Sequence, residues 1–429
     1  MRFFYFLFYL VLVYTLRFYF RHIKVINKPK RFSRTIYVSN HPAAFMDPLL
    51  IASCNRAVVF FMTRSDVFNA FTRPIFWTAH MLPIYRQRDG VDTKIKNLEV
   101  FRKSSEILLR NRSLLVFGEG VSDDDFVRRL KPLKKGALRI GFTALEACDW
   151  KKDIYLAAVG CNYSDPAKYR SDVLLKNSEK IHLNLYRKEF EENPNKVIKQ
   201  LTDKLEELLK ANMIHVDNLE DTTFTERLLH LSRKGMPKFI EDTDTLEHRW
   251  DLTKKLIDDF NANPSKYESL KSPIHNYFEK LEARDLNDGE IYDAKQSSVK
   301  VSDFIFQFLK LPVILLGALH CGIFYYSIKA YVESNFSRPV FWGSTKLVMM
   351  IFICGLSNLA VFFVLPKYIG FLGTVVYFLT VPLMGFVFHS SLVFWRDLKR
   401  NNKINAMNLS VLLEERLTLR IKIAEITNE

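Results

Sequence analysis

His41 and Asp47 stand six residues apart in the stretch SNHPAAFMDP (39–48), close to Pro42 and Pro48. A histidine can accept the proton of a reacting hydroxyl, and a carboxylate hydrogen-bonded to its ring fixes the tautomer and stabilises the imidazolium that forms. On a regular helix six residues correspond to about 600°, so the two side chains would point well apart. A joint role for them therefore requires the chain to bend.

The residues on either side predict how this bend is held. The β-branched and aromatic run 35–38 predicts a short strand, and 49–52 predicts the opening of a helix. Asp47 is then an N-cap candidate with Pro48 at the first helical position, and His41 lies in the turn between strand and helix. A purely structural role, with Asp47 as a cap and His41 as a turn residue, remains an open alternative at this point.

Three further loop-like stretches carry charged residues and glycines, namely LPIYRQRDG (82–90), FGEGVSDDD (117–125) with LKKG (133–136), and VGCNYSDP (159–166). Arg86 and Lys134 could hold a phosphate, the first bidentately and the second as a point charge. The bend at 118–120 would bring backbone N–H groups close to an anion. Acyl transfer to a phosphate-bearing alcohol needs such cations beside a base and a group that orients the base. Each stretch could equally be an ordinary strand-to-helix connection.

Residues 35–190 alternate apolar runs with helical windows, the pattern of an α/β fold whose loops gather at one edge of a central sheet. The strands are expected at 35–38, 58–62, 114–117, 154–159 and 181–185. The helices are expected at 48–54, 65–79, 93–111, 136–148 and 195–211.

Residues 36–190 resemble the glycerolipid acyltransferase family, membrane enzymes that acylate glycerol 3-phosphate or lysophosphatidic acid. The family's blocks have counterparts here in NHPAAFMD (Asn40, His41, Asp47), LPIYR (Arg86), FGEGVS (Phe117, Glu119, Gly120, Ser122) and, loosely, LAAVGCNYSDP (Val159, Gly160). Two features depart from the family pattern. Five residues separate His41 from Asp47 where four are commoner, a spacing found in one branch with glycerol-3-phosphate acyltransferases. Gly118 and Ala158 stand where the family often has proline.

The resemblance implies a reaction and a role for each matching residue. His41 would take the proton from the acceptor hydroxyl, which attacks the thioester of an acyl-CoA or acyl carrier protein, and Asp47 would orient His41. The predicted substrate-binding residues are Asn40, Arg86, Glu119, Gly120, Ser122 and Lys134. No covalent acyl-enzyme, cofactor or metal is expected. The acceptor is glycerol 3-phosphate or 1-acylglycerol 3-phosphate, with the longer spacing slightly favouring the first.

Hydrophobic residues are concentrated at the two ends of this 429-residue chain. The apolar run 3–16 is too short to cross a hydrocarbon core of about 30 Å, so it predicts a helix at the membrane interface. The basic residues expected to reach anionic headgroups are Arg17, Arg21, Lys24, Lys28, Lys30, Arg31 and Arg34. Three later stretches, 311–328, 347–365 and 368–393, are long enough to span. Both ends of that bundle are basic, which predicts that both lie in the cytoplasm and that one stretch is re-entrant.

The net charge of +15 suits an anionic membrane, and no nucleic-acid-binding motif accompanies it. The five cysteines are scattered without metal-ligand spacing, which fits a reducing cytosolic face. The predicted fold class is an α/β acyltransferase domain with a central mixed sheet, an N-terminal membrane-interface helix, a helical insert and C-terminal transmembrane helices. The predicted parts are an interface helix with a basic linker (1–34), the α/β domain (35–211), a charged helical region (212–300), a transmembrane bundle (301–396) and a basic cytoplasmic tail (397–429).

Three other functions compete with this prediction. A serine lipid hydrolase would need a G-x-S-x-G nucleophile elbow, which the chain lacks. The triplet 123–125 could hold Mg²⁺ for a phosphate substrate, but one acidic triplet is more typical of a solvated loop. A catalytically inactive membrane scaffold or partner-binding protein remains the main alternative, although the presence of both His41 and Asp47 speaks against it.

Overall fold

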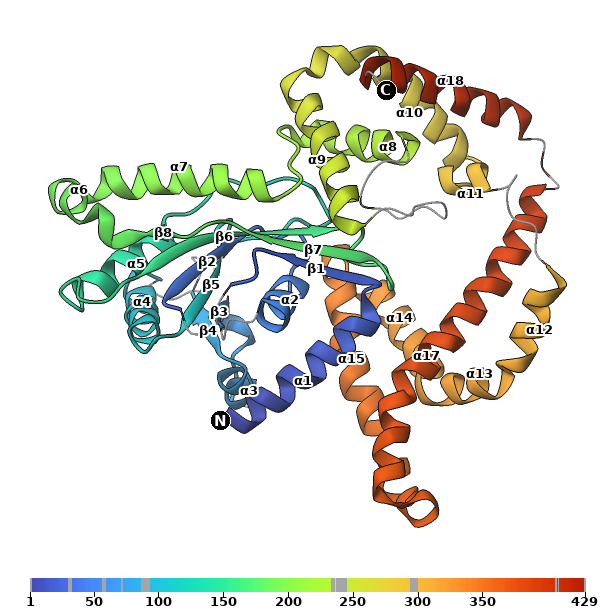
Figure 1. Cartoon of the computed structure of the whole chain (residues 1–429), viewed down its shortest axis with the longest axis horizontal. Helices are drawn as coiled ribbons and strands as arrows, with labels where there is room; N and C mark the ends of the chain where they lie inside the picture. Colours follow the sequence, from blue (N-terminus) through green and yellow to red (C-terminus); the bar gives the residue numbers. More distant parts are fainter. Residues whose placement is uncertain are drawn as a thin grey trace. The chain divides into compact units, whose positions relative to one another are not determined.

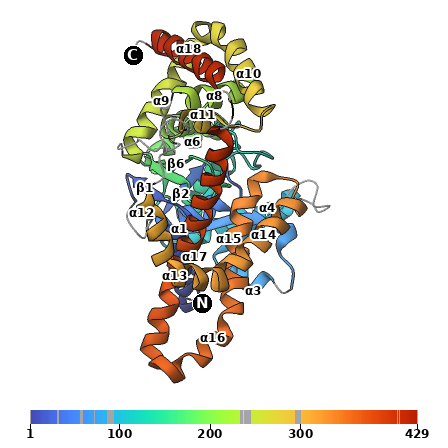
Figure 2. The same ribbon diagram turned by 90° about the vertical axis from the view of Figure 1, so that its right-hand side faces the viewer.

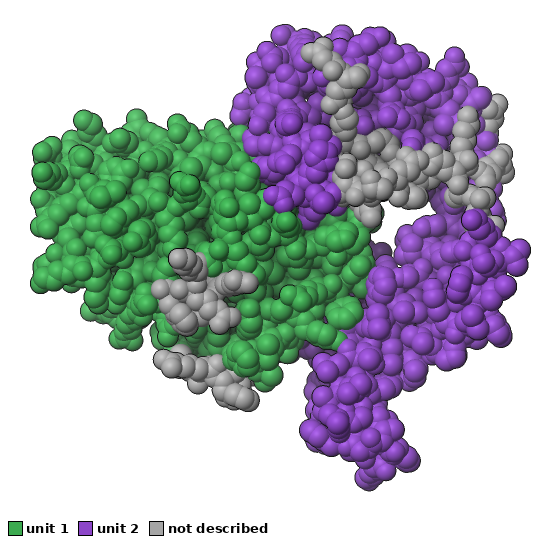
Figure 3. Space-filling view, in the orientation of Figure 1, with its two compact units in different colours: residues 1–215 green, residues 216–429 purple. Residues whose placement is uncertain are grey.

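The computed structural model describes residues 2–427 apart from 30–32, 56–58, 71, 86–92, 233–235, 237–244, 294–299, 406 and 408. Its chain forms two compact units, Met1–His215 and Val216–Glu429 (Figure 3). The first unit contains the sheet, and the second is helical throughout its described residues (Figure 1).

The first unit is built on an eight-stranded mixed sheet with the order β1-β7-β6-β2-β5-β3-β4, in which β8 pairs with β6. The strands β2, β3, β4 and β5 are parallel, and β6 runs parallel to β2 but antiparallel to β7 and β8. The predicted mixed α/β sheet is therefore confirmed. The strands are β1 (His22–Ile26), β2 (Thr35–Ser39), β3 (Val59–Arg64), β4 (Met81–Ile84), β5 (Ser113–Phe117), β6 (Tyr155–Tyr163), β7 (Asp172–Asn177) and β8 (Ile181–His182).

Three strands, β1, β4 and β7, were not predicted. Each is short, and each is obscured by a local feature: β1 lies in a basic run, β4 contains Pro83 and β7 begins and ends with a polar residue. The stretch 17–34, interpreted as a linker, thus contributes an edge strand. Arg21, expected at lipid headgroups, instead forms a two-point ion pair with the buried carboxylate of Asp172, with Nε 3.0 Å from Oδ1.

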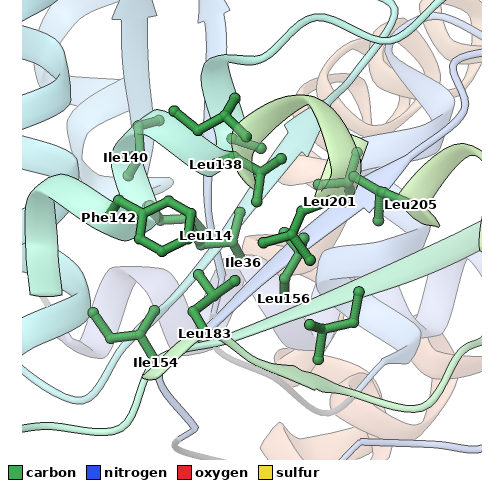
Figure 4. Packing of buried hydrophobic residues seen from close by; sticks show 14 of the residues in the cluster. Ile36, Leu114, Leu138, Ile140, Phe142, Ile154, Leu156, Leu183, Leu201 and Leu205 are labelled. Carbon is green, nitrogen blue, oxygen red and sulfur yellow. The ribbon is translucent and has the colours of Figure 1, made fainter. Parts of the chain in front are cut away.

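Helices cover both faces of the sheet. On one face, α4 (Thr93–Leu109), α5 (Gly136–Glu146) and α7 (Pro194–Asn212) bury the main hydrophobic cluster. Figure 4 shows Ile36, Leu114 and Leu156 of the strands packed against leucines and phenylalanine of α5 and α7. Alternate strand residues therefore point to this face, and those between them point to the other. The short helix α6 (Arg187–Glu192) leads into α7.

The other face is covered by α1 (Arg2–Tyr19) and α2 (Met46–Cys54), with α3 (Thr72–Thr78) preceding edge strand β4. The predicted helix 65–79 is divided, because a 3₁₀ turn occupies Ser65–Val67. Leu12 and Leu16 of α1 are buried against the domain, whereas Phe6, Leu7 and Leu10 are exposed. This helix thus has one apolar side packed on protein and another that is open.

The second unit begins with a helical region of α8 (Thr222–Ser232), α9 (Leu246–Ala262), α10 (Glu268–Glu282) and α11 (Asp288–Asp293). The last helix, α18 (Ser410–Thr427), packs on α8 and α10 (Figure 2). Arg416 of α18 reaches Asp288 of α11 through a bidentate pair of 2.7 and 3.0 Å, and both residues are buried. The stretch predicted as a tail is therefore part of the helical region.

Three helical stretches are long and apolar enough to cross a membrane, Leu311–Asn335, Pro339–Val364 and Pro366–Asn402. All three predicted spans are found here. The individual helices are α12 (Val301–Leu309), α13 (Leu311–Gly317), α14 (Ile323–Asn335), α15 (Trp342–Ser357), α16 (Leu359–Val364) and α17 (Pro366–Asn405).

The segments that flank these spans meet each other. Arg400, at the end of the last span, contacts Glu290 and Asp285, which precede the first, with Nε 2.6 Å from Oε1 of Glu290 and Nη1 2.8 Å from Oδ2 of Asp285. Gln307 of α12 accepts a hydrogen bond from Ser391 of α17. Three complete crossings would separate these flanks by the thickness of the bilayer, so this arrangement agrees with the prediction that one stretch is re-entrant.

Candidate active site

His41 and Asp47 are joined by a direct hydrogen bond, with His41 Nδ1 2.8 Å from Asp47 Oδ2. The bend between them is a turn over 42–45 that includes Ala44 at φ 46°. It follows the carboxyl end of β2, which lies between β6 and β5 in the sheet. The site is thus at the carboxyl edge of the parallel strands, the usual ligand-binding edge of an α/β sheet.

The predicted cap at Asp47 is wrong in detail. Helix α2 begins one residue earlier, at Met46, and the residue before it, Phe45, makes no side-chain cap. The Asp47 carboxylate instead accepts the backbone N–H of Ala43 at 3.0 Å, across the turn. Asp47 therefore stabilises the bend itself while it holds the histidine.

Tyr163 provides a third hydrogen bond to Asp47, with its hydroxyl 2.7 Å from Oδ1. Burial, together with the nearby Asp47 carboxylate, raises the pKa of Tyr163 well above its usual range, so the hydroxyl remains a donor. Asp47 is fully buried. A buried carboxylate needs such partners, and here His41, Ala43 and Tyr163 supply them.

Sequence reasoning did not single out Tyr163, because its apolar run suggested a strand ending at 159. Strand β6 in fact continues to Tyr163, beyond the end of its neighbour β2 at Ser39. This overhang carries Tyr163 beside the 42–45 turn. A nine-residue strand next to a five-residue one was the missing signal.

The His41 ring is oriented by Phe117, the last residue of β5, on which it stacks with ring centroids 4.0 Å apart. Its side chain is 20% exposed. With Nδ1 bonded to Asp47, the other ring nitrogen, Nε2, has no partner among the described residues. This nitrogen is available to accept a proton from a ligand.

Asn40 has a different environment from the one predicted. Its amide donates to the carbonyl of Cys161 at 3.1 Å and its oxygen accepts the N–H of Cys161 at 2.8 Å, so both polar atoms are engaged by β6. The side chain is 2% exposed. This geometry favours a role in positioning the start of the turn over contact with a substrate.

Glu119 lies beside His41 because the sheet register pairs Ser39 with Phe117, two residues before each of them. The backbone N–H of His41 hydrogen-bonds Glu119, whose other carboxylate oxygen, Oε1, is buried without a partner in the described part of the chain. Burial raises the pKa of the Glu119 carboxyl to about 8. At neutral pH this carboxyl is therefore largely protonated and can donate a hydrogen bond.

The loop after Glu119 brings Lys134 close to Gly120. Gly120 has φ 74°, and a Cβ there would lie 2.6 Å from Lys134 Nζ. At Gly118 a Cβ would lie 2.7 Å from the Leu133 side chain, which explains why the proline frequent in the family is absent at this position. Arg128 ties the loop to β6 by donating to the carbonyl of Tyr163 at 2.7 Å.

The remaining predicted site residues are divided. Ser122 is half-buried in the loop that follows Gly120. Arg86 lies outside the described residues. In the acidic triplet, Asp123 pairs with Lys131 at 2.6 Å. The described residues contain no group of three or more histidine, cysteine or acidic side chains that could hold a metal ion.

Comparison with known proteins adds little to this geometry. No protein-family model and no curated protein matches the sequence. The chain is similar to a solved structure, the 1-acyl-sn-glycerophosphate (LPA) acyltransferase PlsC from Thermotoga maritima, with 17% identity and a TM-score of 0.28, over 46% of this chain and 78% of that one. The assignment of a function therefore depends on the His41 site itself.

Proposed function

We propose that this protein is a membrane-bound acyltransferase that moves a fatty acyl group from a thioester to the hydroxyl of a glycerophosphate acceptor. The observation that supports it best is the hydrogen bond between His41 and a fully buried Asp47, at the carboxyl end of a central strand. The donor is acyl-CoA or acyl carrier protein. The acceptor is glycerol 3-phosphate or 1-acylglycerol 3-phosphate, and the product enters phospholipid synthesis.

In the proposed reaction, Nε2 of His41 takes the proton from the acceptor hydroxyl as its oxygen attacks the thioester carbonyl. Asp47 stabilises the imidazolium that forms. When the tetrahedral intermediate collapses, the C–S bond breaks, and His41 returns the proton to the departing thiolate. An ester and a free thiol result, with no acyl group on the enzyme.

The phosphate of the acceptor would bind at the loop beyond β5. Lys134 supplies a positive charge beside Gly120, and the protonated Glu119 can donate a hydrogen bond to a phosphate oxygen. Arg86 and Ser122 complete this proposed subsite. An anionic Glu119 would repel the phosphate, so its raised pKa suits an anionic ligand.

The membrane features support a lipid substrate. The chain has three potential spans, and α1 exposes Phe6, Leu7 and Leu10. We propose that this face of α1 lies in the bilayer interface, where acyl chains and product reside. We further propose that the active site faces the cytoplasm and that residues 35–211 act as the catalytic domain.

The test is acyl transfer by the purified full-length protein from labelled acyl-CoA, with glycerol 3-phosphate and 1-acylglycerol 3-phosphate offered in parallel. His41→Ala should abolish transfer. His182→Ala is the matched control, because His182 also pairs with a carboxylate, Asp153, at 3.0 Å, but away from the site. Transfer that survives His41→Ala would contradict the mechanism. Absence of transfer in the wild type with acyl-CoA and acyl carrier protein donors would favour the scaffold alternative.

A further inference from the structure

A second site lies at the edge of the sheet, where α3, β4 and α4 enclose an open cavity of about 570 Å³. This volume is within the range of small-molecule sites, roughly 300–1,000 Å³. The residues that line the cavity and carry the argument are Phe68, Arg73, Trp77, Tyr85, Glu99 and Lys103.

The cavity opens at the same edge of the sheet as His41. Phe68 and Tyr85 follow the carboxyl ends of β3 and β4, and these strands are parallel to β2. The order β2-β5-β3-β4 places β4 three strands from the strand that ends before His41. With strands about 4.8 Å apart, the two positions are separated by about 14 Å along one edge.

The lining combines aromatic faces with a cation. Phe68, Trp77 and Tyr85 come from three different segments, and Trp77 is 47% exposed despite its size. Aromatic faces of this kind stack on nucleobases, with about 1–3 kcal/mol per base.

Arg73 is the cation available for an anion. No ion pair or side-chain hydrogen bond engages its guanidinium in the part of the chain that the structure describes. Lys103, by contrast, is held by Glu99 at 2.8 Å. A guanidinium offers bidentate hydrogen bonds to phosphate.

We infer that this cavity binds the adenosine phosphate end of coenzyme A while the thioester lies at His41. The inference rests on the proposed function and selects acyl-CoA over acyl carrier protein as its donor. The arm that joins nucleotide and thioester is comparable to about four extended residues, or about 14 Å, which matches the separation along the sheet. Stacking by Trp77 and phosphate binding by Arg73 then fix the donor at its far end.

Direct binding provides the first test. Full-length protein in detergent should bind labelled adenosine 3′,5′-bisphosphate, and Arg73→Gln or Trp77→Ala should weaken that binding about 10-fold. Trp77→Phe should preserve most of it, because an aromatic face remains. The matched control is Arg102→Gln, an exposed arginine on α4 that does not line the cavity. No binding by the wild type, or equal binding by wild type and both cavity variants, would overturn the inference.

Kinetics separate this inference from the proposed function. Arg73→Gln should raise KM about 10-fold for an acyl-CoA but leave KM unchanged for the matching acyl-4′-phosphopantetheine, which lacks the nucleotide. If both donors behave alike in wild type and variant while transfer continues, the cavity assignment fails and the proposed function stands. If neither donor supports transfer but the bisphosphate still binds at Arg73, the proposed function fails instead.

Discussion

Tyr163 is the residue that most extends the predicted pair, because it hydrogen-bonds the face of Asp47 turned away from His41. Tyr163→Phe keeps the ring and removes only the hydroxyl. A hydrogen bond to a charged group contributes about 1.5–3 kcal/mol, so we expect kcat to fall roughly 10- to 100-fold. KM for the acceptor should stay within about twofold, because Tyr163 does not contact it in the proposed complex.

Steady-state kinetics on the purified variant check this expectation. Tyr155→Phe, at the other end of β6, is the control and should behave as wild type. A rise in KM with unchanged kcat would assign Tyr163 to substrate binding, in contradiction to a positioning role.

Glu119 predicts a pH dependence of stability. Its pKa is raised from 4.5 to about 8 in the folded protein. Below pH 4.5 the carboxyl is protonated in both states, and its contribution to stability is fully present. As pH rises toward 8, the unfolded chain releases the proton while the folded chain retains it, so a contribution on the order of a few kcal/mol is lost.

Glu119→Gln removes this titration and leaves a neutral side chain of similar shape. Thermal unfolding in detergent at pH 5, 6.5 and 8 measures the effect. The stability of wild type relative to the Gln variant should fall as pH rises through this window. A difference that stays constant with pH would mean that the carboxyl is already ionised in the folded protein.

Among the helices, α18 is attached to the helical region by a buried ion pair. Arg416→Met leaves the Asp288 carboxylate buried without its cation, although Tyr277 still donates to it at 3.0 Å. Breaking such a pair costs about 3–5 kcal/mol. We therefore expect a lower unfolding temperature for this variant, and earlier proteolysis at α18.

Two comparisons sharpen this test. The double variant Arg416→Met, Asp288→Leu should recover most of the loss, because no unpaired charge remains. Lys280→Ala breaks a partly exposed pair with Glu415 on the same helix, 2.9 Å long, and should cost about 0–1 kcal/mol. Equal losses in Arg416→Met and Lys280→Ala would show that burial of the pair is not what matters.

For the whole chain, the contact of Arg400 with Glu290 and Asp285 predicts the membrane topology. Cysteines introduced at Lys300 and Asn402, in a variant whose native cysteines are serine, should lie on the same side of the membrane. In sealed vesicles an impermeant maleimide should label both or neither, and detergent should make both reactive. Labelling of one site alone would require an odd number of crossings.

Local sequence patterns determined much of this protein. The bend at 39–48 needs only residues close in the chain, and the apolar spans and most strands depend on composition and period within a short window. The contacts of Tyr163 and Glu119 with the His41 turn are different. They depend on the sheet order, on the overhang of β6 and on the register of β2 with β5, which pairwise contacts between distant segments establish. The packing of α18 and the cavity beside β4 arise in the same way, because each brings together side chains that no local pattern connects.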